Sequence, residues 1–142
     1  MILVDTSALL SAMDADDPDQ GRTATVLRAS RGPRLISPFV LAELDYLLNR
    51  RVGSAVARRF LDELTGGVYR LEPFDSDDVG RATAILDRYR DLELGIADAS
   101  IVVLAERHGI GEIVTLDERH FRAVPGPGGR PFRILPADLH GG

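Results

Sequence analysis

The chain has 142 residues, of which 44% are hydrophobic and 27% are charged, and these values predict one globular domain with a single core. The absence of Cys excludes disulfides, thiolate catalysis and sulfur-ligated zinc, and the lack of a membrane-length apolar run or a secretory signal predicts a cytoplasmic protein. The net charge of −5 argues against broad, tight nucleic-acid binding, although all 17 basic residues are Arg, which favours bidentate phosphate contacts.

The first element is a short apolar run at residues 2–4, followed by Asp5, Thr6 and Ser7. A continuous apolar run bounded by polar residues is typical of a strand buried on both faces of a parallel sheet. Asp5 then lies at the carboxyl end of the strand, where open α/β sheets bind ligands, and Thr6 or Ser7 can cap the next helix. Taken alone, Asp5 also fits a capping acid that the helix dipole favours.

A second strand is predicted at residues 34–37 and leads into a helix at residues 38–48. At about 100° per residue, Glu43 projects between Phe39 and Leu47, inside an apolar sector of that helix. A buried carboxylate is costly unless it is paired or bound to a metal. We therefore expect Glu43 either to serve a metal site or to pair with a buried Arg.

The next informative stretch is residues 94–105, in a helix that Gly109 is predicted to end. The helix is apolar nearly all round and is therefore expected to be central. Asp98 lies in its first turn, where the helix dipole favours an anion but the apolar surroundings do not. A metal and a buried Arg are equally good candidates for the compensating charge. The strand predicted at residues 112–116 then runs into Asp117, which repeats the pattern of the first strand.

The remaining stretches complete an alternation of helices and short strands. Further helices are predicted at residues 19–30, 54–65 and 75–91, an edge strand at residues 68–71 and a last strand at residues 132–135. This alternation predicts a single α/β domain over residues 1–142, with a central parallel sheet of four to five short strands and helices on both faces.

Four acids occupy positions from which one site can form: Asp5, Glu43, Asp98 and Asp117. At ~4 Å and an effective dielectric constant of ~20, each pair of carboxylates repels by about 4 kcal/mol, so the cluster requires a divalent cation or a proton. Oxygen-only ligation suits Mg²⁺ or Mn²⁺. Such ions activate water and stabilise the in-line displacement of a phosphodiester without a nucleophilic Ser, Cys or His.

Four motifs in the chain resemble those of PIN-domain proteins, and in particular the VapC-type toxins of bacterial toxin–antitoxin modules. They are ILVDTSALL at residues 2–10, SPFVLAEL at residues 37–44, GIADAS at residues 95–100 and TLDERHF at residues 115–121. The resemblance covers essentially the whole chain. It implies a PIN-like α/β/α sandwich, a Mg²⁺-dependent endoribonuclease that acts on RNA, a homodimer, and an antitoxin that holds the enzyme inactive.

The resemblance also implies roles for individual residues. The acidic site of the family maps onto Asp5, Glu43, Asp98 and Asp117, with Asp5 and Asp98 as the most usual metal ligands. Thr6 or Ser7 matches the hydroxyl that supports the site. An antitoxin is expected to place an Arg or Lys near Asp5 and Asp98, and to cover apolar surface of the first helix at Leu9, Leu10 and Met13.

Other functions remain open at this point. A haloacid-dehalogenase-like phosphatase requires a second Asp where Ser7 stands, and a dinucleotide-binding enzyme requires a glycine-rich turn after the first strand, which the chain lacks. A PIN-like binding module with negligible hydrolysis, or a nuclease of the same fold that acts on DNA, fits the same residues.

Overall fold

The computed structural model describes residues 1–139, and these residues contain one parallel sheet of five strands. Along the sheet the strands follow the order β3-β2-β1-β4-β5. Their bounds are Ile2–Val4 for β1, Arg34–Ile36 for β2, Arg70–Leu71 for β3, Glu112–Val114 for β4 and Arg133–Leu135 for β5. The predicted α/β class, the parallel sheet and the edge position of the strand near residue 70 are therefore confirmed.

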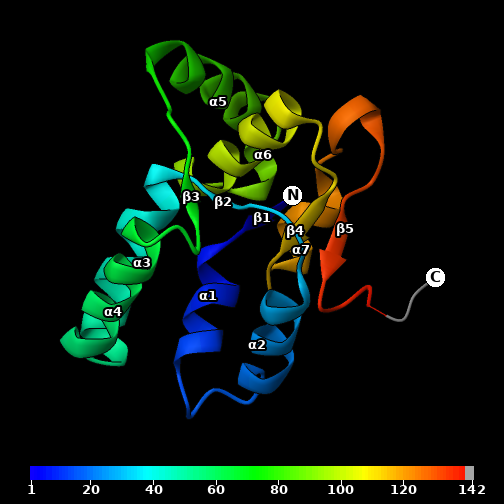
Figure 1. Cartoon of the computed structure of the whole chain (residues 1–142). Helices are drawn as coiled ribbons and strands as arrows, with labels where there is room; N and C mark the ends of the chain where they lie inside the picture. The colour runs from blue at the N-terminus through cyan, green and yellow to red at the C-terminus, as the bar shows by residue number, and fades with distance from the viewer. Residues whose placement is uncertain (140–142) are drawn as a thin grey trace.

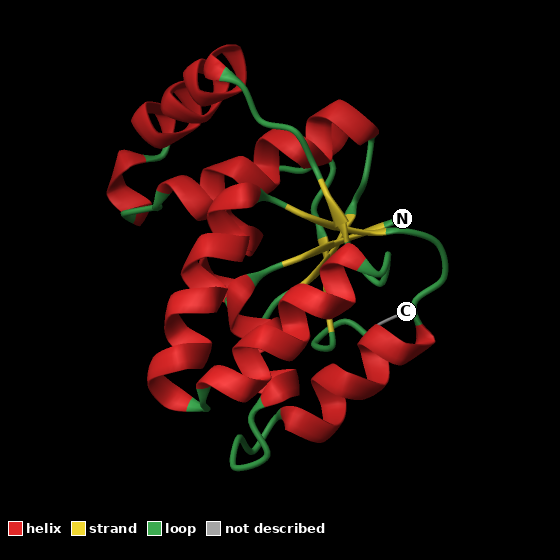
Figure 2. Cartoon of the chain, turned by 60° about the vertical axis from the view of Figure 1, so that its left-hand side comes forward, coloured by secondary structure: helices red, strands yellow, loops and turns green. Residues whose placement is uncertain are grey.

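Helices cover both faces of the sheet (Figures 1 and 2). They are α1 (Thr6–Met13), α2 (Gln20–Ala29), α3 (Pro38–Arg51), α4 (Ser54–Thr65), α5 (Ser76–Arg88), α6 (Ile96–His108) and α7 (Glu118–Ala123), with short 3₁₀ helices η1 (Arg90–Leu92) and η2 (Pro127–Gly129). Helices α1 to α4 lie on one side of the sheet, and α5 and α6 lie on the other (Figure 1). Right-handed crossovers between parallel strands produce this division. No helix in the described residues is long and apolar enough to cross a membrane.

The core lies between the central strands and the helices that face them. All three residues of β1 are buried, and α6 buries residues on most of its circumference, as its apolar sequence predicts. Helix α6 ends at Gly109, whose φ of 64° is a left-handed conformation that glycine adopts without the steric cost of a Cβ. The chain passes from this end of α6 into the amino end of β4, so the first turn of α6 lies toward the carboxyl end of that strand.

The register of the two central strands aligns the residues that follow them. Leu3 pairs with Ile113 and Val4 pairs with Val114, so the next residues, Asp5 and Thr115, are neighbours. The Asp5 amide extends this ladder by donating a hydrogen bond to the Val114 carbonyl at 3.0 Å. Because both strands end here, the polar residues after β1 and β4 meet at one edge of the sheet.

Candidate active site

Asp5 lies at the carboxyl end of β1, with only 5% of its surface exposed. Its Oδ2 accepts hydrogen bonds from Thr115 Oγ1 at 2.7 Å and from Ser7 Oγ at 3.0 Å. Asp5 occupies the N-cap position of α1, but its side chain makes no capping hydrogen bond. Asp5 thus stands where a capping acid would, but its side chain bonds to Thr115 and Ser7 instead. The expectation that Thr6 or Ser7 caps α1 is wrong, because that helix already begins at Thr6.

The hydroxyls beside Asp5 join two turns of the chain. Ser7 Oγ accepts from the Leu116 amide at 2.9 Å, and Thr115 Oγ1 accepts from the Asp117 amide at 2.9 Å. Each hydroxyl has one hydrogen and donates it to Asp5, so the 3.1 Å contact between these two oxygens carries no hydrogen bond of its own. The turn after β1 and the turn after β4 are thus held together through the Asp5 carboxylate.

Burial changes the acidity of Asp5. Desolvation raises the pKa of its carboxyl group from 3.8 to about 6, against the hydrogen bonds from Thr115 and Ser7, which lower it. The negative charge of Asp98 raises the pKa of Asp5 further. The chain therefore holds a carboxylate where its charged form is disfavoured, which is expected of a site that binds a cation.

Asp98 stands in the first turn of α6, where its Oδ2 accepts a hydrogen bond from the Gly95 amide at 3.1 Å. Burial raises its pKa, the Gly95 hydrogen bond and the positive charge of His120 lower it, and the charges of Asp117 and Glu43 raise it. The four acids predicted from the sequence are thus close enough to act on one another. The expected buried Arg is wrong: the basic side chain within 4 Å of Asp98 in the described residues is His120.

Glu43 is exposed, which corrects the expectation that it is buried among apolar residues. The buried face of α3 consists instead of Val40, Leu44 and Leu48. Glu43 nevertheless lies near enough to Asp98 for its charge to raise the pKa of that carboxyl group. Within residues 1–139 Glu43 has no basic partner within 4 Å, so the predicted ion pair with a buried Arg is also wrong.

Asp117 caps α7, and its Oδ1 accepts a hydrogen bond from the His120 amide at 3.2 Å. The other carboxylate oxygen, Oδ2, lies 2.7 Å from His120 Nδ1, which is itself 3.8 Å from Asp98 Oδ2. His120 Nδ1 is buried and makes no hydrogen bond of acceptable geometry with any described residue. The predicted site does not include His120, although its position three residues after Asp117 in a helical turn places both side chains on one face.

The most compact part of the site consists of Asp98, Asp117 and His120. One ligand atom from each of these residues lies within 4.8 Å of the others. A buried nitrogen that has no hydrogen-bond partner and faces two carboxylates fits a bound cation, because a cation satisfies all three groups at once. Asp5 adjoins this group through its electrostatic interaction with Asp98. The donor set therefore fits a divalent metal ion.

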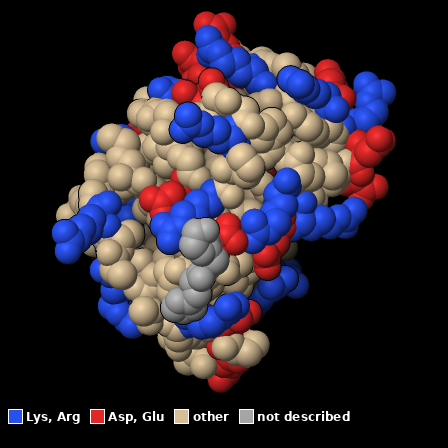
Figure 3. Space-filling view, turned by 90° about the vertical axis from the view of Figure 1, so that its right-hand side faces the viewer, with Lys and Arg blue, Asp and Glu red and all other residues tan. Residues whose placement is uncertain are grey.

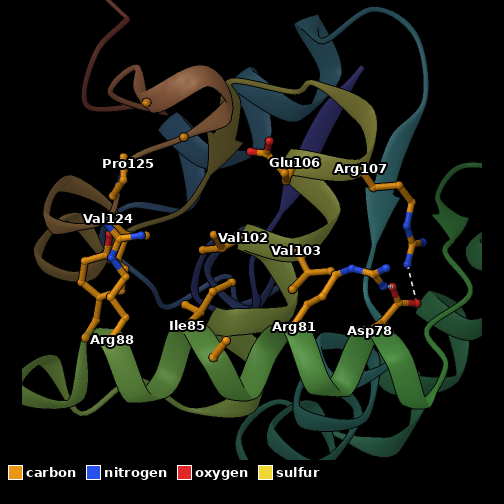
Figure 4. Close-up of a pocket in the computed structure, with 14 residues that line it drawn as sticks. Asp78, Arg81, Ile85, Arg88, Val102, Val103, Glu106, Arg107, Val124 and Pro125 are labelled. Atoms are coloured by element: carbon orange, nitrogen blue, oxygen red, sulfur yellow. Dashed lines mark hydrogen bonds and ion pairs between the residues drawn. The ribbon is translucent and has the colours of Figure 1, made fainter.

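A separate cavity of about 830 Å³ lies between α5, α6 and the segment that contains η2 (Figure 4). Its apolar floor includes Val102 and Val103, and its only buried carboxylate among the described residues is Asp78. Arg107 at 2.6 Å and Arg81 at 3.1 Å already pair with Asp78. None of the four predicted acids lines this cavity, so it is distinct from the acidic site.

Comparisons with known proteins agree with this geometry. The PIN domain family matches residues 2–127. Ribonuclease VapC26 of Mycobacterium tuberculosis is 41% identical over 135 residues, which are 95% of this chain and 100% of that protein. The crystal structure of VapC20 of the same organism, a sarcin-ricin loop cleaving toxin, superposes with a TM-score of 0.78 and 27% identity over 84% of this chain and 92% of that one.

A more distant structure shares the fold alone. VapBC2 of Rickettsia felis, which was solved bound to a DNA fragment from its promoter, superposes with a TM-score of 0.66 at 18% identity. The superposition covers 94% of this chain and 98% of that one.

Proposed function

The chain belongs to the PIN-domain family, and from this premise we propose that it is a VapC-type toxin, an endoribonuclease that a cognate antitoxin holds inactive. The observation that carries the proposal is the group formed by Asp98, Asp117 and His120, whose ligand atoms lie within 4.8 Å of one another and include a buried imidazole nitrogen without a hydrogen-bond partner. The names of its relatives, a ribonuclease and a sarcin-ricin loop cleaving toxin, support the same activity.

In this proposal a divalent metal ion is held by Asp5, Asp98 and Asp117, with Glu43 at the open side and His120 as an additional ligand. Bound Mg²⁺ or Mn²⁺ supplies a Lewis acid that lowers the pKa of a bound water and neutralises charge on a phosphodiester. The imidazole nitrogen favours Mn²⁺ relative to Mg²⁺, which prefers oxygen ligands.

The surrounding residues orient the acids for this chemistry. Ser7 and Thr115 fix the Asp5 carboxylate through Oδ2, and neither of these hydroxyls engages its other oxygen. The Gly95 amide holds Asp98 in the same way. Glu43 is exposed at the rim and unpaired within the described residues, so it is the acid that is free to take a proton from an attacking water.

RNA affinity has to come from local Arg side chains, because the net charge of the chain is −5. On the face shown in Figure 3, Arg side chains lie between acidic groups rather than in one continuous patch. Ion pairs engage some of these cations: Arg122 lies 2.6 Å from Asp138, and Arg133 lies 2.8 Å from Glu112. This distribution favours recognition of a particular RNA shape over general binding to the phosphate backbone.

The proposed antitoxin places an Arg against Asp5 and Asp98, where a guanidinium can engage carboxylate oxygens and displace the metal. The same partner is proposed to cover apolar surface near α1, where a cavity of about 470 Å³ is lined by Met13 together with residues of α2 and α4. Leu10 and Met13 are partly buried, but the expectation that Leu9 is accessible is wrong, because its exposed fraction is 0%. A homodimer that acts in the cytoplasm completes the proposal.

The decisive experiment measures cleavage of matched RNA and DNA substrates with Mg²⁺, with Mn²⁺ and with EDTA. We expect RNA cleavage that requires metal and falls by at least two orders of magnitude in Asp5→Asn and Asp98→Asn, while the exposed control Asp16→Asn retains it. Cleavage of DNA alone makes the chain a DNA nuclease. The absence of any metal-dependent cleavage would favour a binding module instead.

The antitoxin contact has its own test, a titration of the antitoxin's carboxyl-terminal peptide against RNA cleavage at several Mg²⁺ concentrations. Competition predicts that more peptide is required as Mg²⁺ rises. Inhibition that is independent of Mg²⁺, together with unchanged peptide affinity in Asp98→Asn, would show that the carboxylates do not anchor the partner.

A further inference from the structure

Three side chains form a continuous stripe along the exposed side of α3: Glu43, Tyr46 and Arg50. Their spacing of three and then four residues places them on one face of the helix. Tyr46 is 58% exposed, and the Arg50 guanidinium carbon lies over its ring at 5.6 Å from the centroid. Arg50 Nη1 also donates a hydrogen bond to the Tyr46 hydroxyl at 3.3 Å.

Packing does not explain this stripe. Helix α3 is anchored to the core by Val40, Leu44 and Leu48, which lie on a different face of the helix and are fully buried. Tyr46 contributes an aromatic ring to the surface at a position where the fold requires none. Arg50 holds the ring and, within the described residues, has no carboxylate within 4 Å, so its charge is available to an anion.

The stripe is continuous with the acidic site. Helix α3 begins two residues after the carboxyl end of β2, which pairs with β1, so Glu43 in its second turn lies toward the sheet edge that holds the acidic site, and its charge acts on Asp98. Tyr46 follows one helical turn further along the same face. At 1.5 Å per residue, Tyr46 stands about 4.5 Å and Arg50 about 10 Å along the helix axis from Glu43. An acid, an aromatic ring and a cation therefore succeed one another outward from the proposed metal centre.

We propose that Tyr46 and Arg50 form a platform for single-stranded RNA, on which Tyr46 stacks a base flanking the scissile phosphodiester and Arg50 contacts the next phosphate. This inference rests on the proposed ribonuclease function and names residues that select its substrate. Aromatic rings that stack unpaired bases beside a cation are a general means of binding single strands. They suit a chain of net negative charge, because stacking does not depend on neutralising phosphates.

The test compares variants in the Asp5→Asn background, so that a single-stranded oligoribonucleotide with 2-aminopurine at successive positions is bound but not cut. Tyr46→Ala should lose roughly tenfold in affinity and lose the quenching of the base that stacks on the ring, whereas Tyr46→Phe retains both. Arg50→Ala should reduce the slope of log affinity against log salt concentration by about 0.7, and Arg50→Lys should retain that slope.

The chain supplies a matched control. Arg88 lies over the Tyr89 ring at the same 5.6 Å, but this pair belongs to the end of α5 rather than to the stripe. Tyr89→Ala should leave RNA affinity and quenching unchanged, and thermal melts verify that each variant is folded.

Cleavage assays with Asp5 intact distinguish failure of the proposed ribonuclease function from failure of the proposed platform. Absence of cleavage by the wild type counts against the ribonuclease function, whereas cleavage with equal kcat/KM in Tyr46→Ala and wild type overturns the platform. Loss of antitoxin affinity in Tyr46→Ala with unchanged RNA affinity also overturns it, because the stripe is then a protein contact.

Discussion

Replacing Asp5 by Asn should stabilise the metal-free protein at alkaline pH, although it removes a proposed ligand. In the folded chain burial raises the pKa of Asp5 from 3.8 to about 6. Below pH 3.8 the carboxyl group is protonated in both the folded and the unfolded states, and its burial carries no charge penalty. Between pH 3.8 and about 6 the unfolded chain loses this proton while the folded chain keeps it, so stability falls across this window, and above it the full penalty of the buried charge remains. A difference of about 2 pKa units corresponds to about 3 kcal/mol.

Asn avoids this penalty because it is neutral at every pH. Its side-chain oxygen can still accept the hydrogen bonds from Ser7 and Thr115. Its amide N–H groups are new donors, however, and they have no acceptor at a position built for a carboxylate oxygen. Subtracting about 1–2 kcal/mol for these donors leaves a net stabilisation of roughly 1–2 kcal/mol. For a chain of this length that is roughly a 5 °C rise in melting temperature at pH 8 in EDTA.

The measurement is thermal and urea unfolding of wild type and Asp5→Asn from pH 4 to pH 8 in EDTA, with the exposed Asp16→Asn as the control. The advantage of Asp5→Asn should shrink below pH 6, disappear at about pH 5 and become a deficit of about 1–2 kcal/mol at pH 4, where only the cost of the unpaired amide donors remains. Saturating Mg²⁺ should reverse the order at pH 8, because only the wild type retains the carboxylate ligand. Equal stabilities in EDTA at pH 8, or a difference that does not change with pH, would refute a penalty from the buried charge.

Three further predictions follow from the site and its supports. The wild type should melt at a higher temperature in Mg²⁺ than in EDTA, because a Mg²⁺ concentration one hundred times Kd stabilises the folded state by about 2.7 kcal/mol. Identical melting temperatures would count against a shared metal site. His120→Gln should weaken Mn²⁺ binding in calorimetry by about tenfold and Mg²⁺ binding by less, whereas an equal loss for both ions would argue against imidazole ligation. Ser37 caps α3, and its Oγ lies 2.6 Å from the buried Ser100 Oγ. Ser37→Ala should therefore lower the free energy of unfolding in urea by about 1–2 kcal/mol, while the exposed control Ser54→Ala should change it little. Equal losses in the two variants would contradict the capping role.

Much of the fold was predictable because its signals are local. Short apolar runs that end in polar residues indicate buried parallel strands, and Gly109 ends α6 at the position where the sequence places it. The helix predicted at residues 54–65 matches the bounds of α4. The helix predicted at residues 75–91 was too long, because α5 ends at Arg88 and the chain continues into a separate 3₁₀ turn. Helical periodicity does not reveal such a break when the polar pattern continues across it.

Some residues of the site were likewise predictable from their sequence neighbours, whereas others depend on the tertiary structure. The sequence by itself determined that Asp5 follows a buried strand and that Asp98 opens an apolar helix, because both depend on the residues next to them. Only the tertiary structure decided that Glu43 is exposed, because the same helical face can turn toward a core or toward an open sheet edge. It also decided that Ser7 and Thr115 share one carboxylate and that His120 faces Asp98. Those contacts join segments up to 110 residues apart, and they depend on strand register and helix packing, which no local pattern specifies.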